Sequence, residues 1–127
     1  MEKKTIREKR TYILIKTEKS LTEKELYFKL KKELKINFGK LIYSEMNFKT
    51  IKPWKRKYKG KQKHYSNIKK EMKENNLHLI SCKRDFEKML RFILPSFNIS
   101  KNKKNNLKTI KTSHNIQPIR KYINEIS

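Results

Sequence analysis

The apolar residues of this 127-residue chain fall into short segments whose periodicity alternates between that of a strand and that of a helix. The first segment, Thr11–Thr17, is a run of β-branched and aromatic residues with the composition of a buried strand. Leu26, Leu30 and Leu34 then recur every four residues and form one apolar stripe on a helix. This alternation restricts the chain to a fold in which helices pack against a sheet.

Local signals predict where the helices begin and end. Ser20 and Glu23 have the spacing of a capping box, in which each side chain satisfies a free amide of the first turn. Gly39 stands where a left-handed helix terminator is expected. Asp85 is predicted to cap a second helix, which Pro95 brings to an end.

Three further strands and a terminal helix complete the pattern. Composition and alternation predict strands at Leu41–Ile51, Leu77–Cys82 and Leu107–Thr112, and a helix at Pro118–Ile126. We therefore predict an α+β fold: a βαββαβ two-layer sandwich whose antiparallel sheet has helices on one face, plus a C-terminal helix and a basic insertion. The chain is expected to form a single domain over residues 1–127.

The segment 52–76 is the basic insertion. The apolar period disappears there, and lysines and arginines crowd the segment around Trp54. A loop of this length in a compact domain is usually functional or disordered, although Tyr65–Lys73 could form a short basic helix. Two interpretations therefore stay open for the insertion: an RNA-binding loop and a solvated loop. A polar linker is expected at 98–106.

The charge balance indicates a polyanionic partner. Lys and Arg total 35 against 12 Asp and Glu, which gives a formal net charge of +23. Such a surplus repels itself in a compact fold unless a polyanion neutralises it. Nucleic acid is favoured over an anionic membrane or an acidic protein, because the chain has the aromatic and β-branched residues of a real core, which an electrostatic tail lacks.

The single cysteine and the apolar runs narrow the cellular context. Cys82 cannot form an intramolecular disulfide and indicates a reducing compartment, and at a strand end it is expected to be a small buried hydrophobe. The charged residues 1–10 contain no secretory signal, and the sequence has no apolar run of the length that a membrane span needs. An intracellular protein outside the membrane is expected.

No catalytic constellation is visible in the sequence. His64, His78 and His114 are scattered, and none has the spacing of a metal ligand pair. Asp85 and Glu87 resemble acid pairs that hold a metal ion in nucleases, so a stand-alone metal-dependent nuclease stays an alternative. We expect no catalytic residue and no metal site in the protein itself.

Basic and aromatic residues are instead the candidate site. Lys and Arg contact phosphates, and aromatic rings offer faces on which unpaired bases stack. The third predicted strand has no aromatic residue, so binding is expected to use loops, tails and phosphate contacts and not base stacking on the sheet. The candidate RNA-binding residues are Arg7, Lys9, Arg10, Tyr12, Trp54, Lys55, Arg56, Lys57, Lys59, Lys83 and Arg84.

Four segments form a wider pattern when taken in order. They are a basic opening, Thr5–Ile15 (TIREKRTYILI); a helix end with a turn and strand, Lys35–Asn47 (KINFGKLIYSEMN); an apolar strand entering a helix, Leu79–Ile93 (LISCKRDFEKMLRFI); and a final strand and helix entry, Leu107–Ile123 (LKTIKTSHNIQPIRKYI). This order resembles the smallest conserved protein of ribonuclease P and ribonuclease MRP. That subunit is called processing-of-precursors subunit five in eukaryotes and ribonuclease P component two in archaea.

The resemblance implies a non-catalytic subunit of an RNA-based endoribonuclease. The RNA cuts with its own magnesium, so the protein would bind no cofactor. Its partners would be the catalytic RNA, precursor tRNA and a barrel-fold ribonuclease P protein subunit, and no membrane. The reaction is 5′ maturation of precursor tRNA, and rRNA processing in the MRP complex. The location would be the nucleus or nucleolus in a eukaryote and the cytoplasm in an archaeon.

A second RNA-binding function stays open, and the fold also predicts a surface for a protein partner. A ribosomal or ribosome-assembly RNA-binding protein would share the charge and the small sandwich. A small sandwich also leaves apolar residues and sheet edges open. We therefore expect Tyr12, Leu14, Ile42 and Phe92 to be exposed for a protein partner.

Overall fold

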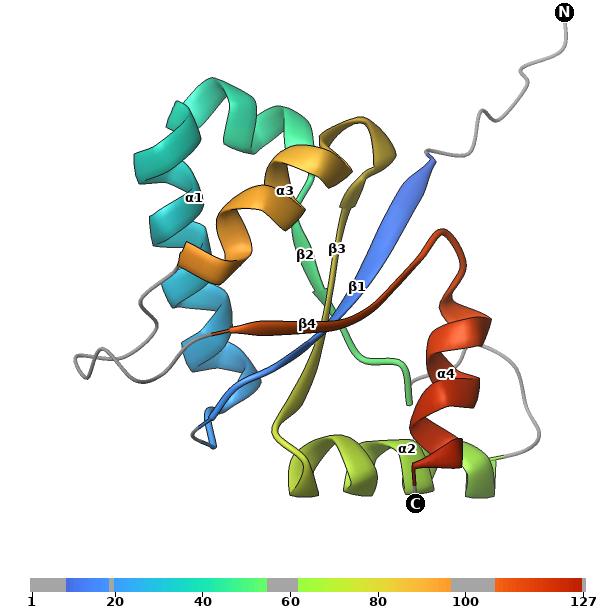
Figure 1. Ribbon diagram of the computed structural model, residues 1–127. Helices are drawn as coiled ribbons and strands as arrows, with labels where there is room; N and C mark the ends of the chain where they lie inside the picture. The colour runs from blue at the N-terminus through green and yellow to red at the C-terminus, as the bar shows by residue number, and fades with distance from the viewer. Residues whose placement is uncertain (1–8, 19, 55–61, 97–106, 127) are drawn as a thin grey trace, which may run out of the picture.

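The computed structural model describes residues 9–18, 20–54, 62–96 and 107–126 (Figure 1). Within them, one antiparallel sheet has the order β2-β3-β1-β4, built from β1 (Arg10–Lys16), β2 (Lys49–Ile51), β3 (Leu77–Lys83) and β4 (Lys108–Ser113). The α-helices are α1 (Glu23–Met46), α2 (Gln62–Glu74), α3 (Glu87–Ile93) and α4 (Ile116–Glu125). The predicted α+β class and antiparallel sheet are confirmed.

The two central strands, β1 and β3, bury side chains on both of their faces. Successive side chains of a strand point to opposite faces. Ile13 of β1 pairs with Ile80 of β3 and belongs to one core cluster, whereas Leu14 pairs with Leu79 and belongs to the other. Both faces of the sheet therefore need a covering layer, which explains the unbroken apolar run in the first strand.

Helices α1 and α3 cover the first face. Leu26, Leu30 and Leu34 are fully buried, as the helical stripe predicts. The N-cap is Thr22, two residues later than the predicted Ser20. The Thr22 hydroxyl accepts from the backbone N–H of Glu25 at 3.1 Å and donates to the Glu25 carboxylate at 3.0 Å. Thr22 and Glu25 have the same spacing as Ser20 and Glu23, so the sequence does not show which pair caps the helix.

The first helix continues past its predicted end. Gly39 does adopt a positive φ of 83°, but its effect is a kink within α1, and the helix runs on to Met46. The segment Leu41–Met46 is therefore helical, and the prediction of a strand from Leu41 was wrong. Ile42 and Met46 are four residues apart, so they share a helix face as well as a strand face. Asn47 then ends the helix with φ 48° and ψ 51°, and β2 has only three residues.

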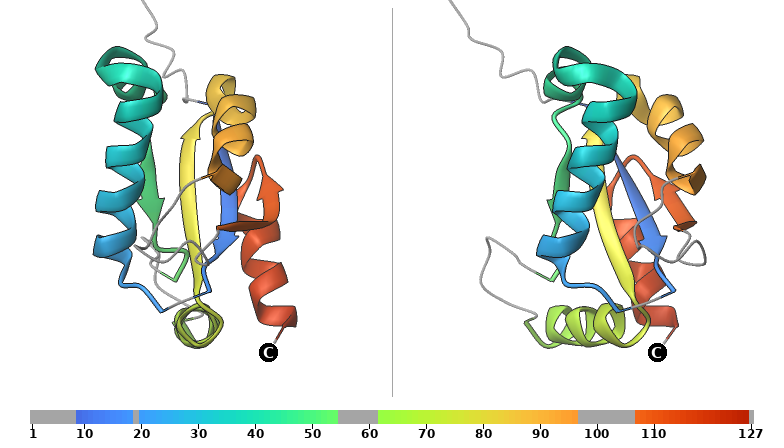
Figure 2. Two further views of the ribbon diagram at one scale, coloured as in Figure 1. Left: turned by 60° about the vertical axis from the view of Figure 1, so that its left-hand side comes forward. Right: turned by 90° about the vertical axis from the view of Figure 1, so that its left-hand side faces the viewer.

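Helices α2 and α4 cover part of the second face, so the prediction of two layers with helices on one face was incomplete (Figure 2). Helix α2 contributes Ile68 and Met72, and α4 contributes Ile119 and Ile123. Part of the predicted loop 52–76 is thus a helix, longer than the short one considered. Its apolar stripe was missed because few of its residues are apolar.

This second helical layer also corrects one predicted exposure. Leu14 is fully buried beneath it, whereas Phe92 on α3 is 85% exposed, and Tyr12 and Ile42 are half-buried. The prediction for Phe92 is confirmed and that for Leu14 was wrong. A buried residue on the far face of a central strand is covered by segments distant in sequence, which no local pattern shows.

The region around α3 departs from prediction at its start and agrees at its end. Arg84–Phe86 forms a 3-10 turn, and α3 begins at Glu87 without a side-chain cap, so Asp85 is exposed and caps nothing. Pro95 lies in the 3-10 turn that follows α3, as expected for a helix terminator. The predicted linker 98–106 lies outside the described residues. Among the helices that the structure describes, none is long and apolar enough to cross a membrane.

Candidate nucleic-acid interface

The second face of the sheet is covered along only half of its length. Helices α2 and α4 lie at one end, above Leu14 and Leu79, and the start of β1 and the end of β3 lie at the other end (Figures 1 and 2). Side chains two residues apart on a strand share a face. The uncovered half, which we call the basic sheet surface, therefore consists of Arg10, Tyr12, Lys49, Ser81, Lys83, Lys111 and Ser113.

Strand register brings these side chains together from all four strands. Arg10 pairs with Lys83, and Ser81 pairs with Tyr12 on one side and Lys49 on the other. The four described strands together carry six Lys or Arg residues and no Asp or Glu. The described strands therefore contribute only positive charge to this surface, which favours a polyanionic ligand.

Arg10 is held in place across the sheet. Its Nε donates to the Ser81 hydroxyl at 2.9 Å, and its Nη2 donates to the backbone carbonyl of Asn47, where α1 ends. The Ser81 hydroxyl in turn donates to the carbonyl of Thr11 at 2.8 Å. The guanidinium therefore extends from β1 over β3 toward the start of β2. A planar guanidinium fixed in this way presents a defined charge and a flat face.

The remaining side chains of the basic sheet surface differ in their exposure. Lys49 is exposed, and Lys83 and Tyr12 are half-buried. Lys111 lies at the border with α4, where its Nζ is 5.9 Å from the centroid of the Tyr122 ring. A cation above an aromatic face gains a modest electrostatic attraction, which fixes the lysine without neutralising it.

The structure gathers some of the predicted RNA-binding residues and separates others. Arg10, Tyr12 and Lys83 lie together on the basic sheet surface, and Lys9 is exposed directly before β1. Arg84 follows β3, with its backbone N–H donating to the Lys9 carbonyl at 2.9 Å. Its Nε atom is buried and has no hydrogen-bond partner in the described part of the chain.

Trp54 lies elsewhere, at the end of the sheet covered by α2, where it packs against the second core cluster. The other candidates, Arg7, Lys55, Arg56, Lys57 and Lys59, are outside the described residues. Lys49 and Lys111 were not among the candidates. These two lysines belong to the basic sheet surface because strands distant in sequence pair with each other. The alternation of residues within one strand does not predict that pairing.

The acid pair that resembles a nuclease site does not converge. The Thr11 hydroxyl and the His114 imidazole both contact one oxygen of Glu87, the imidazole at 3.2 Å. The hydrogen bond from Thr11 holds the pKa of Glu87 below its usual value. Asp85 is exposed, and the described residues contain no group of three or more His, Cys, Asp or Glu that could hold a metal ion.

Cys82 is fully buried within the first core cluster. Burial raises the pKa of its thiol to about 12. The thiolate is the nucleophilic form of cysteine, so this side chain stays an unreactive thiol at neutral pH. Its packing is that of the small buried hydrophobe expected from its place at a strand end.

Comparison with known proteins leaves the function to be inferred from these residues. No family model matches the chain, and no curated protein matches it.

Proposed function

We propose that this chain is an RNA-binding subunit of a ribonucleoprotein and that the basic sheet surface contacts the RNA. The proposal rests on a sheet whose described strands carry six cations and no carboxylate. Helices leave half of one face of this sheet uncovered. Cations on such a surface neutralise phosphates and release the counterions that RNA holds, which favours binding.

Phosphate contact is the main interaction that this surface supports. Lys49, Lys83 and Lys111 come from three different strands, so they can follow a phosphate backbone across the sheet. Arg10 and Tyr12 add flat faces on which an unpaired base can stack. The surface has these two side chains where a base-reading sheet has several aromatics, so sequence selectivity should be weak.

The ordered resemblance of four segments narrows the proposal to a non-catalytic subunit of ribonuclease P or ribonuclease MRP. In that role the chain would support the catalytic RNA during 5′ maturation of precursor tRNA, and magnesium would be held by the RNA. Three of the four resembling segments each contain two residues of the basic sheet surface: Arg10 and Tyr12, Ser81 and Lys83, and Lys111 and Ser113. A nuclear location in a eukaryote, or a cytoplasmic one in an archaeon, would follow.

The opposite helical layer supports a protein partner. Phe28, Ile36 and Leu41 on α1 and Phe92 on α3 are large apolar side chains with exposures between 59% and 85%. A contiguous exposed apolar patch marks a site of protein–protein contact, and a partner that covers α1 and α3 would bury these four side chains. A barrel-fold subunit bound there would leave the basic sheet surface on the other side of the sheet open to RNA.

Identification of co-purified RNA tests the proposal. The chain, isolated from its own cells under conditions that preserve complexes, should retain a small catalytic RNA together with precursor tRNA. Ribosomal RNA in its place would support the ribosome-assembly alternative. Cleavage of RNA by the purified protein alone would contradict both forms of the proposal.

A further inference from the structure

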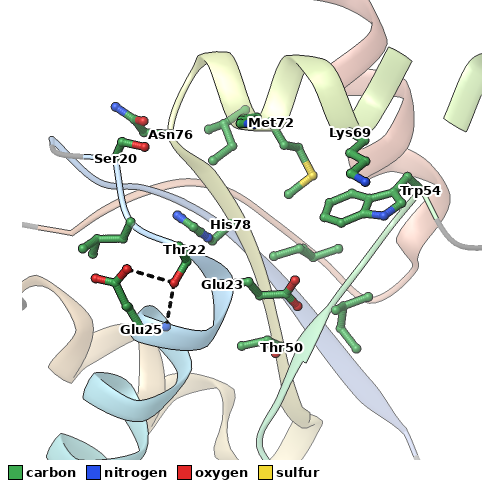
Figure 3. Close-up of a pocket in the computed structure, with 15 residues that line it drawn as sticks. Ser20, Thr22, Glu23, Glu25, Thr50, Trp54, Lys69, Met72, Asn76 and His78 are labelled. Carbon is green, nitrogen blue, oxygen red and sulfur yellow. Dashed lines mark hydrogen bonds between the residues drawn. The ribbon is translucent and has the colours of Figure 1, made fainter. Parts of the chain in front are cut away.

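A pocket lies at the end of the sheet away from the basic sheet surface, between the start of α1, the end of β2, β3 and α2 (Figure 3). Its volume is about 290 Å³, just below the range for pockets that hold drug-sized ligands. Its walls combine apolar side chains, among them Ile51, Trp54 and Met72, with a few polar groups, which is the composition of a small-molecule site.

One wall is an aromatic side chain held in a fixed position. Trp54 is half-buried against the second core cluster. The preceding residue, Pro53, is buried, and its carbonyl accepts from Nε of Arg120 on α4 at 2.9 Å. Lys69 of α2 places its Nζ 5.9 Å from the centroid of the Trp54 ring. The backbone of Trp54 is therefore anchored, and the ammonium group of Lys69 lies over its indole ring.

The opposite wall carries an imidazole whose nitrogens are unused by the protein. Figure 3 shows His78 with Ser20 and Asn76 on the side away from Trp54 and Lys69. The His78 side chain has no hydrogen-bond partner among the residues that the structure describes. Burial lowers its pKa to about 4, so the ring is neutral at pH 7 and offers one donor and one acceptor.

Acidic and basic groups at the pocket indicate the chemistry of its ligand. Glu23 lines the pocket and accepts hydrogen bonds only, and the Nζ of Lys52 is 3.9 Å from one of its oxygens. The other acid, Glu25, is occupied by its bonds with Thr22. Two exposed lysines of α2, Lys69 and Lys73, also line the pocket. A ligand should therefore combine a flat polar ring with a negative group.

We propose that this pocket binds one nucleotide unit, with its base against Trp54 and its phosphate at Lys69 and Lys73. Glu23 favours bases that carry an amino group, because it can only accept. His78 contacts a second polar atom of the base. The nucleotide is either a free mononucleotide or an unpaired nucleotide of RNA; for the second source the inference rests on the proposed function.

Trp54 is the only tryptophan of the chain, so its fluorescence reports on the pocket directly. Titration of the full chain with GMP, AMP, CMP and UMP should quench the emission saturably, with UMP weakest. Ribose 5-phosphate, which has no base to stack, should leave it unchanged. In parallel, a short single-stranded RNA is titrated, with filter binding as a second readout.

Three variants separate binding from folding. Lys69→Ser should weaken binding of the quenching ligand about tenfold, whereas Lys70→Ser, an exposed neighbour that does not line the pocket, should change it less than twofold. Trp54→Leu, read by calorimetry, should weaken binding between about fivefold and a hundredfold, the loss expected for one base stack. Cooperative unfolding of each variant is checked by circular dichroism.

A free mononucleotide and an unpaired nucleotide of RNA are distinguished by which of them quenches the Trp54 fluorescence. Quenching by mononucleotides assigns a free nucleotide, and quenching by RNA alone, weakened by Lys69→Ser, assigns an unpaired nucleotide of RNA. Absence of quenching by either, or equal binding by the Lys69 and Lys70 variants, overturns the inference. Substitutions on the basic sheet surface can still lower RNA binding in that case, so the failure of this inference is distinct from failure of the proposed function.

Discussion

The Nε of Arg10 donates a hydrogen bond of 2.9 Å to the hydroxyl of Ser81, a residue that is fully buried on the neighbouring strand. The same hydroxyl donates to the Thr11 carbonyl at 2.8 Å. One small side chain therefore sets the position of the central cation of the basic sheet surface. Alanine would keep the Cβ of this side chain but would leave the Arg10 donor and the Thr11 carbonyl without this partner.

Ser81→Ala should consequently lower both stability and RNA affinity. Loss of a buried hydrogen-bond partner costs about 1–3 kcal/mol, because groups that remain buried lose a bond that water does not replace. Urea denaturation should show a lower midpoint with an unchanged m-value. Ser113→Ala, on the same surface but only half-buried, is the matched control. Equal midpoints for the Ser81 variant and the wild type would contradict the role assigned to this hydroxyl.

His78 should make stability depend on pH. Its pKa is lowered from 6.5 to about 4 by burial, so between these values the unfolded chain binds a proton that the folded chain does not. The free energy of unfolding should therefore rise as pH increases from about 4 to 6.5, and level off above it. Denaturant midpoints measured across this range check the prediction.

The control for this pH dependence is a second histidine. His78→Asn should flatten the rise, whereas His114→Asn, at an exposed position, should leave it in place. A rise of the same size in the His78 variant would show that other groups cause it. The lowered pKa of Glu87 acts in a separate window: its contribution is present at neutral pH and is lost as pH falls through that lowered pKa.

The acid pair should be dispensable for RNA cleavage. Asp85→Asn and Glu87→Gln should leave turnover by the assembled ribonucleoprotein within a few-fold of wild type. Asp85 is exposed and contacts no metal group, and Glu87 is engaged by Thr11 and His114. Single-turnover cleavage of precursor tRNA measures the effect. A thousand-fold loss with intact assembly would be incompatible with a non-catalytic protein.

Local sequence patterns were sufficient for the parts of the fold that depend on nearby residues. Leu26, Leu30 and Leu34 predict the buried side of α1, and the run around Ile13 predicts the central strand. Patterns failed where two periods coincide. Ile42 and Met46 fit a strand and a helix equally, and the structure places both on the second half of α1.

The site was predictable only in part, for a related reason. Arg10, Tyr12 and Lys83 were candidates because their side chains are basic or aromatic. Lys49 and Lys111 join them through strand pairing, and α2 limits the surface by covering the other half of the face. Pairing and coverage bring together residues far apart in sequence, so no short window of the chain contains the information.

The placement of RNA on the basic sheet surface predicts how RNA affinity depends on salt. Each phosphate contact contributes roughly 0.7–0.9 to the log–log slope of affinity against salt. The triple variant Lys49→Ser, Lys83→Ser, Lys111→Ser should therefore lower the slope by about 2 to 3. Filter binding of one RNA across a salt series measures it.

The matched control removes three exposed lysines from the opposite helical layer, with the same change in net charge: Lys32→Ser, Lys40→Ser, Lys88→Ser. The control should keep a slope within about one unit of wild type, because its lysines lie on the far side of the sheet. An unchanged slope in the surface triple, or an equal fall in both triples, would contradict the placement of RNA on the basic sheet surface.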